Sequence, residues 1–294
     1  MIKIAMIGAD SSHTVEYAKR MCDPSFAPDQ RVYGLLPVSC MAVPSAFQDE
    51  AGIAARCEVL RGLGVTRITT DVQSALDGAD AVMVESNDPA EHLFYMEQCA
   101  AGGMPVWLDK PLAATVVDGK KILELVRRNN IPFFTSSPLR FAADAVEFHR
   151  THPAPRELSL YGALGEAKRG SGVVWYGVHT FELLQLMMKG RAVELSAQKN
   201  LNGVKCVVNY EDGRTAKVEL RSGRYAYGGT ADGDSFEVAA PNAEFYGSTI
   251  KEIEKFFRTG VAPVAPEAAL EVTAMLEAVD RSTGADGTSV EIGA

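Results

Sequence analysis

Residues 79–115 read ADAVMVESNDPAEHLFYMEQCAAGGMPVWLDKPLAAT. The stretch holds an apolar strand pattern at 81–84, a helical pattern, a Gly-Gly turn and a second strand pattern that ends at Asp109. A wholly apolar strand such as AVMV is typical of a sheet covered on both faces, and a strand, helix, strand succession gives parallel strands joined by a right-handed crossover. The same alternation extends from residue 2 to about residue 137. It predicts an α/β domain with a doubly wound parallel sheet.

The pattern changes after about residue 150, where THPAPRE at 151–157 is a turn-rich linker. The segment EDGR at 211–214 separates two strand patterns and has the composition of a hairpin turn, which predicts antiparallel pairing. We therefore expect a first domain at 1–140 and a second, α+β domain at 141–294. The main elements expected after the linker are strands at 205–210, 215–220 and 234–240 and helices at 176–188, 249–260 and 266–284.

Composition narrows the class of protein. The chain has 294 residues, 47% hydrophobic and 23% charged, which suits two globular cores and neither a disordered nor a membrane protein. Its net charge of −9 comes without a dense Lys or Arg cluster, so nucleic acid and anionic membranes are poor partners. No apolar run approaches the roughly 20 residues of a membrane span and no leader pattern opens the chain, so we expect a cytoplasmic location. The five cysteines lack C-x-x-C spacing, so neither a metal site nor a disulfide framework is predicted.

The loop that follows the first strand pattern resembles a dinucleotide-binding turn only in part. In G-x-G-x-x-G the first glycine makes the tight turn, the second lets the pyrophosphate approach, and the third allows close helix packing. In GADSSH only Gly8 is present, with Asp10 and His13 at the other two positions. Ser11 and Ser12 offer hydroxyls at a helix N-terminus, where a phosphate is favoured. The alternative is a capped turn that binds no ligand.

Further polar side chains are expected at the carboxyl ends of parallel strands, where ligands bind in open α/β sheets. Lys110 follows the second strand of the opening stretch, and its side chain suits acid/base work or hydrogen bonding to a substrate oxygen. The alternative is a surface lysine in a turn. The residue that selects the ribose is not found, because the strand predicted at 32–36 ends without a charge, so NAD and NADP stay equally open. The predicted cofactor-binding residues are Gly8, Asp10, Ser11, Ser12, His13, Ser86, Asn87, His92, Asp109, Lys110 and Pro111.

The stretch 85–115, which contains Asp109, Lys110 and Pro111, resembles the region of the Gfo/Idh/MocA family (glucose-fructose oxidoreductase, inositol dehydrogenase and relatives) that ends in Glu-Lys-Pro. The resemblance extends to the opening IKIAMIGA, to residues 132–148 with Arg140, and to residues 249–292. It implies a Rossmann dinucleotide-binding domain and an α+β substrate-binding and oligomerisation domain with an open, mainly antiparallel sheet. It also implies oxidation or reduction of a sugar or polyol with NAD(P).

The family has an Asp four residues before a His on a helix of its second domain. Here His179 matches the histidine, while Trp175 stands at the aspartate position. The resemblance therefore implies Lys110 and His179 as catalytic residues, and a helix would place Trp175, His179 and Glu182 on one face. The predicted substrate-binding residues are Arg140, Trp175, Tyr176 and Glu182. The alternatives are a core histidine, an aromatic core pair and solvated arginines.

Three functions are compatible with these features. The first is an NAD(P)-dependent oxidoreductase acting on a CH–OH group of a sugar, polyol or related compound. The second is a degenerate family member that binds a metabolite or nucleotide as a sensor or accessory subunit, because two loop glycines, the ribose-selecting charge and the family aspartate are absent. The third is a lyase or glycosidase that recycles a tightly held NAD. The expected partners are a small-molecule substrate and further copies of the chain, as a dimer or tetramer paired through the open sheet.

Overall fold

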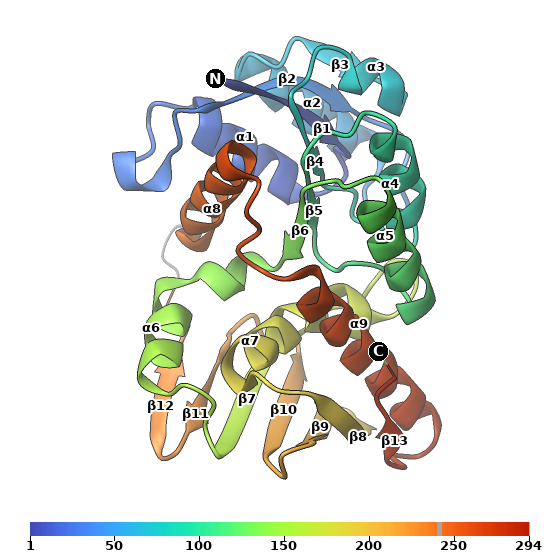
Figure 1. Cartoon of the computed structure of the whole chain (residues 1–294), viewed down its shortest axis with the longest axis vertical. Helices are drawn as coiled ribbons and strands as arrows, with labels where there is room; N and C mark the ends of the chain where they lie inside the picture. The colour runs from blue at the N-terminus through green and yellow to red at the C-terminus, as the bar shows by residue number, and fades with distance from the viewer. Residues whose placement is uncertain (240–242, 294) are drawn as a thin grey trace. The chain divides into compact units, whose positions relative to one another are not determined.

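The computed structural model describes residues 1–239 and 243–293, and the chain forms two compact units (Figure 1). The first unit contains Met1–Ala113, Val117–Ser136 and Tyr246–Pro266, and the second contains Ala114–Val116, Ser137–Phe245 and Glu267–Ala294. The last residue, Ala294, and Ala240 at the end of the strand expected at 234–240 lie outside the described residues. No helix in the described part of the chain has the length and apolar character needed to cross a membrane.

The first unit is built on a six-stranded sheet in the order β3-β2-β1-β4-β5-β6, in which all neighbours are parallel. This confirms the predicted doubly wound parallel sheet. Ile4, Met6, Val82 and Trp107 are wholly buried, as strands covered on both faces require. The strands are β1 Ile2–Ile7, β2 Leu35–Met41, β3 Arg67–Thr69, β4 Ala81–Val84, β5 Val106–Asp109 and β6 Phe133–Ser136.

Helices cover both faces of this sheet, and Figure 1 shows α1 and α8 on one side and α4 and α5 on the other. The helix predicted at 249–260 was assigned to the second domain, and this is wrong. Its buried residues Ile253 and Phe256 face the first sheet, where the rings of Phe134 and Phe256 meet at 4.9 Å. The helices of this unit are α1 Ser12–Cys22, α2 Glu50–Gly62, α3 Val72–Leu76, α4 His92–Ala100, α5 Val116–Arg128 and α8 Phe245–Thr259, with a short 3-10 turn η1 Pro28–Gln30.

The second strand also differs from the prediction. It was expected at 32–36 and to end before Pro37, whereas β2 contains Pro37 and ends at Met41. The pairing of β1 with β2 shifts register between Ile4 and Ala5, next to the point where Ile4 faces Pro37. Proline is tolerated in a strand at such an irregularity, because its missing N–H costs no ladder hydrogen bond there.

The second unit contains a seven-stranded sheet in the order β12-β11-β7-β10-β9-β8-β13, in which only β7 and β10 pair in parallel. The predicted hairpin turn at 211–214 joins β9 and β10, which pair antiparallel, so this prediction is confirmed. The strands are β7 Glu157–Leu164, β8 Ala192–Asn200, β9 Gly203–Tyr210, β10 Thr215–Ser222, β11 Gly228–Ala231, β12 Asp234–Glu237 and β13 Val290–Glu291.

One face of this sheet packs against helices, which Figure 1 shows above the strands. Phe181, Leu184 and Met275 are among the buried residues that join α7 and α9 to the sheet. Along β9 and β10 buried residues alternate with more exposed ones, so the opposite face is open. The helical elements are η2 Pro138–Phe141, α6 Ala143–Thr151, the π-helical turn η3 Val173–Gly177, α7 Val178–Met188 and α9 Pro266–Gly284.

Candidate active site

The turn between β1 and α1 is built around Gly8. Its φ is +112°, and a Cβ at this position would lie 2.6 Å from the backbone nitrogen of Ser86, so only glycine fits. The Thr14 hydroxyl donates to the Gly8 carbonyl at 2.8 Å, and the Ser11 hydroxyl accepts from the His13 N–H at 3.1 Å as the N-cap of α1. Ser12 is the first residue of α1. The first glycine therefore has the role that its position in a dinucleotide-binding turn predicts.

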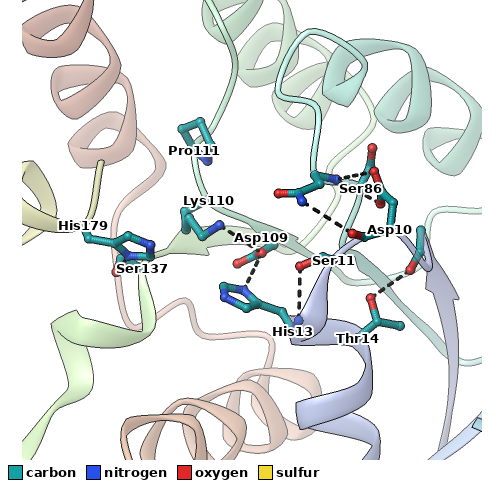
Figure 2. A network of polar contacts seen from close by, with 12 residues as sticks. Asp10, Ser11, His13, Thr14, Ser86, Asp109, Lys110, Pro111, Ser137 and His179 are labelled. Atoms are coloured by element: carbon teal, nitrogen blue, oxygen red, sulfur yellow. Dashed lines mark hydrogen bonds and ion pairs between the residues drawn. The ribbon is translucent and has the colours of Figure 1, made fainter. Parts of the chain in front are cut away.

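Asp10 stands at the second glycine position, and its carboxylate points toward the loops that contain Ser45 and Asn87 (Figure 2). The carboxylate accepts from the Ser45 hydroxyl at 2.6 Å and from the backbone N–H of Asn87, which lies 3.1 and 3.2 Å from its two oxygens. The Asn87 amide donates in turn to the Asp10 carbonyl at 3.4 Å, and the Arg56 guanidinium donates to the Ala9 and Asp10 carbonyls. Asp10 is only 6% exposed. Its charge is therefore satisfied within the first unit.

His13, at the third glycine position, contacts Asp109 instead of packing as a small residue. Its Nδ1 lies 2.7 Å from Oδ2 of Asp109, and Lys110 Nζ lies 3.6 Å from the same oxygen (Figure 2). Burial alone would raise the pKa of Asp109, but the charges of His13 and Lys110 and the His13 hydrogen bond overcome this and hold that pKa below its usual range. Asp109 is thus a buried carboxylate that orients both His13 and Lys110.

His92 ties together the loops that follow β4 and β5. Its ring is wholly buried, with Nδ1 2.8 Å from the Pro111 carbonyl and Nε2 2.9 Å from the Ser86 carbonyl. Both partners are backbone carbonyl oxygens, one in the loop after β4 and one in the loop after β5. The peptide bond between Lys110 and Pro111 is cis. His92 therefore links the turn that contains Lys110 and Pro111 to the loop that contains Ser86.

Sequence reasoning missed Glu85, which follows β4 directly and precedes Ser86. Its side chain is wholly buried, and neither carboxylate oxygen has a hydrogen-bond partner among the described residues. Burial, with a further contribution from the charge of Asp109, raises the pKa of Glu85 well above its usual range, which favours the neutral form of the group. The available signal was its place directly after the wholly apolar AVMV strand.

In the second unit His179 lies in the first turn of α7. Its Nδ1 shares a hydrogen bond with the Ser137 hydroxyl at 2.7 Å (Figure 2). The rings of Tyr176 and Tyr227 stand edge to face against His179, with centroids 5.4 and 5.9 Å away. His179 is therefore oriented by a hydroxyl and by aromatic edges.

Arg140 and Glu182, both predicted to bind substrate, contact each other. Nη1 of Arg140 donates to the Glu182 carboxylate at 2.8 Å and to the Glu182 carbonyl at 3.2 Å. Burial raises the pKa of Glu182, and Arg140 opposes that rise. This buried ion pair connects η2, which contains Arg140, to α7, which contains Glu182.

Trp175 and Tyr176 belong to the π-helical turn η3, a rare form that is frequent at functional sites. Both border a cavity of about 870 Å³ in the second unit, together with Tyr225, Lys199 and Asp280. His179 and Glu182 do not border that cavity. The expectation that Trp175, His179 and Glu182 share one face stays a prediction; Tyr176 is an aromatic neighbour of His179, and Trp175 borders the cavity.

Comparison with known proteins bears on the fold. No protein-family model and no curated protein matches the sequence. A myo-inositol dehydrogenase from Lactobacillus casei, solved with NAD(H) and myo-inositol, is 12% identical with a TM-score of 0.79, covering 100% of this chain and 97% of that one. A putative myo-inositol dehydrogenase from Sinorhizobium meliloti 1021 is 13% identical with a TM-score of 0.80, covering 100% of both chains.

An oxidoreductase from Agrobacterium radiobacter, solved with NAD+, L-tartaric acid and magnesium, is 16% identical with a TM-score of 0.76, covering 99% of this chain and 98% of that one. At these identities the likeness is one of fold. The two-domain fold implied by the resemblance to the Gfo/Idh/MocA family is confirmed over the whole chain, and what those proteins bind is a property of those proteins.

Proposed function

We propose that this chain is an NAD(P)-dependent oxidoreductase that acts on the CH–OH group of a sugar, polyol or related hydroxy compound. The observation that carries the proposal is Lys110 at the carboxyl end of β5, oriented by the buried anion of Asp109. Ligands bind at this edge in open parallel sheets. The chain also shares its fold, end to end, with an oxidoreductase solved with NAD+ and with a dehydrogenase solved with NAD(H).

The residues of the first unit fit such a cofactor in part. Gly8 allows the tight turn, the hydroxyl of Ser12 lies in the first turn of α1, and Lys110 lies beyond the end of the central strands. The exceptions are the inward-turned carboxylate of Asp10 and the His13 ring, which stand where the fingerprint has glycine. Residues Ala42 and Val43, which follow β2, bring no charge to the ribose position, so both NAD and NADP remain candidates.

When bound, the nicotinamide would supply the hydride step. The chain would supply the proton. The Lys110 ammonium, oriented by Asp109, would donate a hydrogen bond to the substrate oxygen and give it a proton when a carbonyl is reduced. In the reverse direction the neutral amine would take up the proton of the hydroxyl group. His179 is the second proposed proton-transfer group, with Ser137 fixing the orientation of its ring. A positioned acid or base of this kind contributes about 10²–10⁴ in rate.

For substrate binding we propose that Trp175 and Tyr176 contact the apolar face of a small polyhydroxy compound, since the ring of Tyr176 lies against His179 and the ring of Trp175 lies against Tyr176. Arg140 and Glu182 act by holding η2 against α7. We further propose a cytoplasmic homo-oligomer. The open face of the second sheet carries a hollow of about 590 Å³ lined by Tyr161, Lys205 and Arg221, among others, and this face is the proposed contact surface.

The first test is a titration of the ligand-stripped protein with NADH and NADPH, followed by nicotinamide fluorescence and by quenching of its two tryptophans. Micromolar binding of either is expected and would justify a screen of polyols and sugar acids. Absence of binding up to millimolar concentration of both would overturn the proposal and favour the sensor function. On the substrate found, Lys110→Ala should lower kcat strongly, whereas Arg169→Ala, which changes an exposed residue, should not.

A further inference from the structure

We propose that the carboxylate of Asp10 is an internal anion that occupies the phosphate position of the β1–α1 turn and so sets the cofactor affinity of this chain. The inference rests on the proposed function. Its consequence is that a dinucleotide binds only by displacing the Asp10 carboxylate. The cofactor is then held weakly and exchanges freely.

The first argument is the set of donors that Asp10 engages. In the sheet, β1 lies between β2 and β4. The Asp10 carboxylate accepts hydrogen bonds from the Ser45 hydroxyl, in the loop after β2, and from the Asn87 backbone N–H, in the loop after β4. In open α/β sheets a ligand binds just outside the carboxyl ends of the strands, so the donors in these two loops would otherwise be open to a phosphate. Here a side chain of the protein already holds them.

The second argument is space. The cavity bordered by Gly8, Asp10, Ser45 and Ser86 has a volume of about 10 Å³. That is about the room for one water molecule. A diphosphate cannot enter until the Asp10 carboxylate and the Ser45 segment move.

The third argument is charge. The remaining described residues around this cavity are Ala9, Val43, Pro44, Glu91 and Tyr95, none of which is basic. The nearby guanidinium of Arg56 is already bonded to the Ala9 and Asp10 carbonyls. A phosphate would thus meet the Asp10 carboxylate at contact and a second carboxylate, Glu91, nearby, while the donors of the nearby cation Arg56 are directed at the two carbonyls.

A different role for Asp10 makes the opposite prediction. A carboxylate near the end of β2 binds the ribose hydroxyls in NAD-selective folds. If Asp10 did so, its removal would weaken NADH binding and spare NADPH. If Asp10 is an internal anion, its removal tightens both cofactors and also inorganic pyrophosphate, because the phosphate position is opened for all three.

The experiment compares the whole chain with Asp10→Gly, which removes the side chain, and Asp10→Asn, which keeps its shape and its acceptor for the Asn87 N–H. Asp88→Asn is the matched control, since Asp88 is also a buried carboxylate and accepts from the Ala90 N–H in the next loop. NADH, NADPH and inorganic pyrophosphate are titrated by calorimetry, and thermal unfolding identifies any variant that has not folded. The Asn variant keeps the test valid if the Gly variant is unfolded.

We expect both Asp10 variants to bind all three ligands about tenfold more tightly or better, as removal of one repulsive contact predicts, with the control unchanged. Unchanged or weaker binding by folded variants, or loss of NADH binding alone, overturns the inference. If the unmodified chain binds cofactor and the variants bind no tighter, the inference fails and the proposed function stands. If only the variants bind, the inference stands and the function fails.

Discussion

Replacing the buried acid Glu85 by Gln is expected to stabilise the first unit increasingly as the pH rises. Glu85 is wholly buried without hydrogen-bond partners, and burial raises its pKa in the folded chain well above the unfolded value. Above about pH 4.3, the ordinary pKa of Glu, the unfolded chain releases a proton that the folded chain keeps. The free energy of unfolding therefore falls by about 1.4 kcal/mol per pH unit through this group, up to the folded pKa. Glutamine has no proton to release, so the free energy of unfolding of the variant does not fall with pH through this position.

The measurement is urea unfolding of both chains at a series of pH values from about pH 5 upward, since the linkage is active between the ordinary pKa of Glu and the raised pKa of the folded chain. A Trp175→Phe background leaves Trp107, wholly buried in β5, as the fluorescence probe of the first unit. The free energy of unfolding of the Glu85→Gln chain minus that of its parent should grow by about 1.4 kcal/mol per pH unit. The amide itself adds a difference that does not depend on pH, so it does not change this slope. Glu124→Gln, at an exposed position of α5, should give a difference independent of pH. A flat or falling difference for the Glu85 variant would refute the assignment of a neutral acid.

Three further outcomes are expected. Lys110→Ala should lower kcat about a hundredfold or more on the substrate found, the size of a lost acid/base group, and a loss no larger than that of Arg169→Ala would remove Lys110 from the mechanism. Gly8→Ala should lower the stability of the first unit by a few kcal/mol, roughly the cost of a strained φ plus a backbone clash, as measured by thermal unfolding. Arg140→Met should destabilise the second unit by about 3–5 kcal/mol because it strands a buried carboxylate, and adding Glu182→Met should recover most of that loss; no recovery in the double variant would contradict the pairing.

The parts of the fold that were predictable depend on short-range patterns. Wholly apolar strand patterns with helices between them led to the parallel sheet, and the turn at 211–214 led to the hairpin of β9 and β10. The helix expected at 266–284 coincides with α9. Such features follow from backbone geometry and periodicity within a few residues, so no knowledge of distant partners is needed.

The errors have a common cause in distant partners. The apolar face of α8 identifies an amphipathic helix but not the sheet that it covers, and the helix returns to the first unit although its neighbours in sequence belong to the second. Pro37 ended the predicted strand, but the register shift against β1 accommodates it. Short elements such as β3 and α3 lack enough residues for a clear period.

The sequence by itself determined which chemically active side chains lie at strand ends: Asp10, Asp109 and Lys110 in the first unit, with His179 on a helix of the second. Only the tertiary structure decided their partners, because hydrogen bonds and ion pairs depend on distances of a few ångströms between residues far apart in the chain. Asp109 contacts His13 across 96 positions and Asp10 contacts Asn87 across 77. Burial likewise belongs to the assembled structure: it raises the pKa of Glu85, whereas at Asp109 the effect of burial is overcome by His13 and Lys110, which lower the pKa.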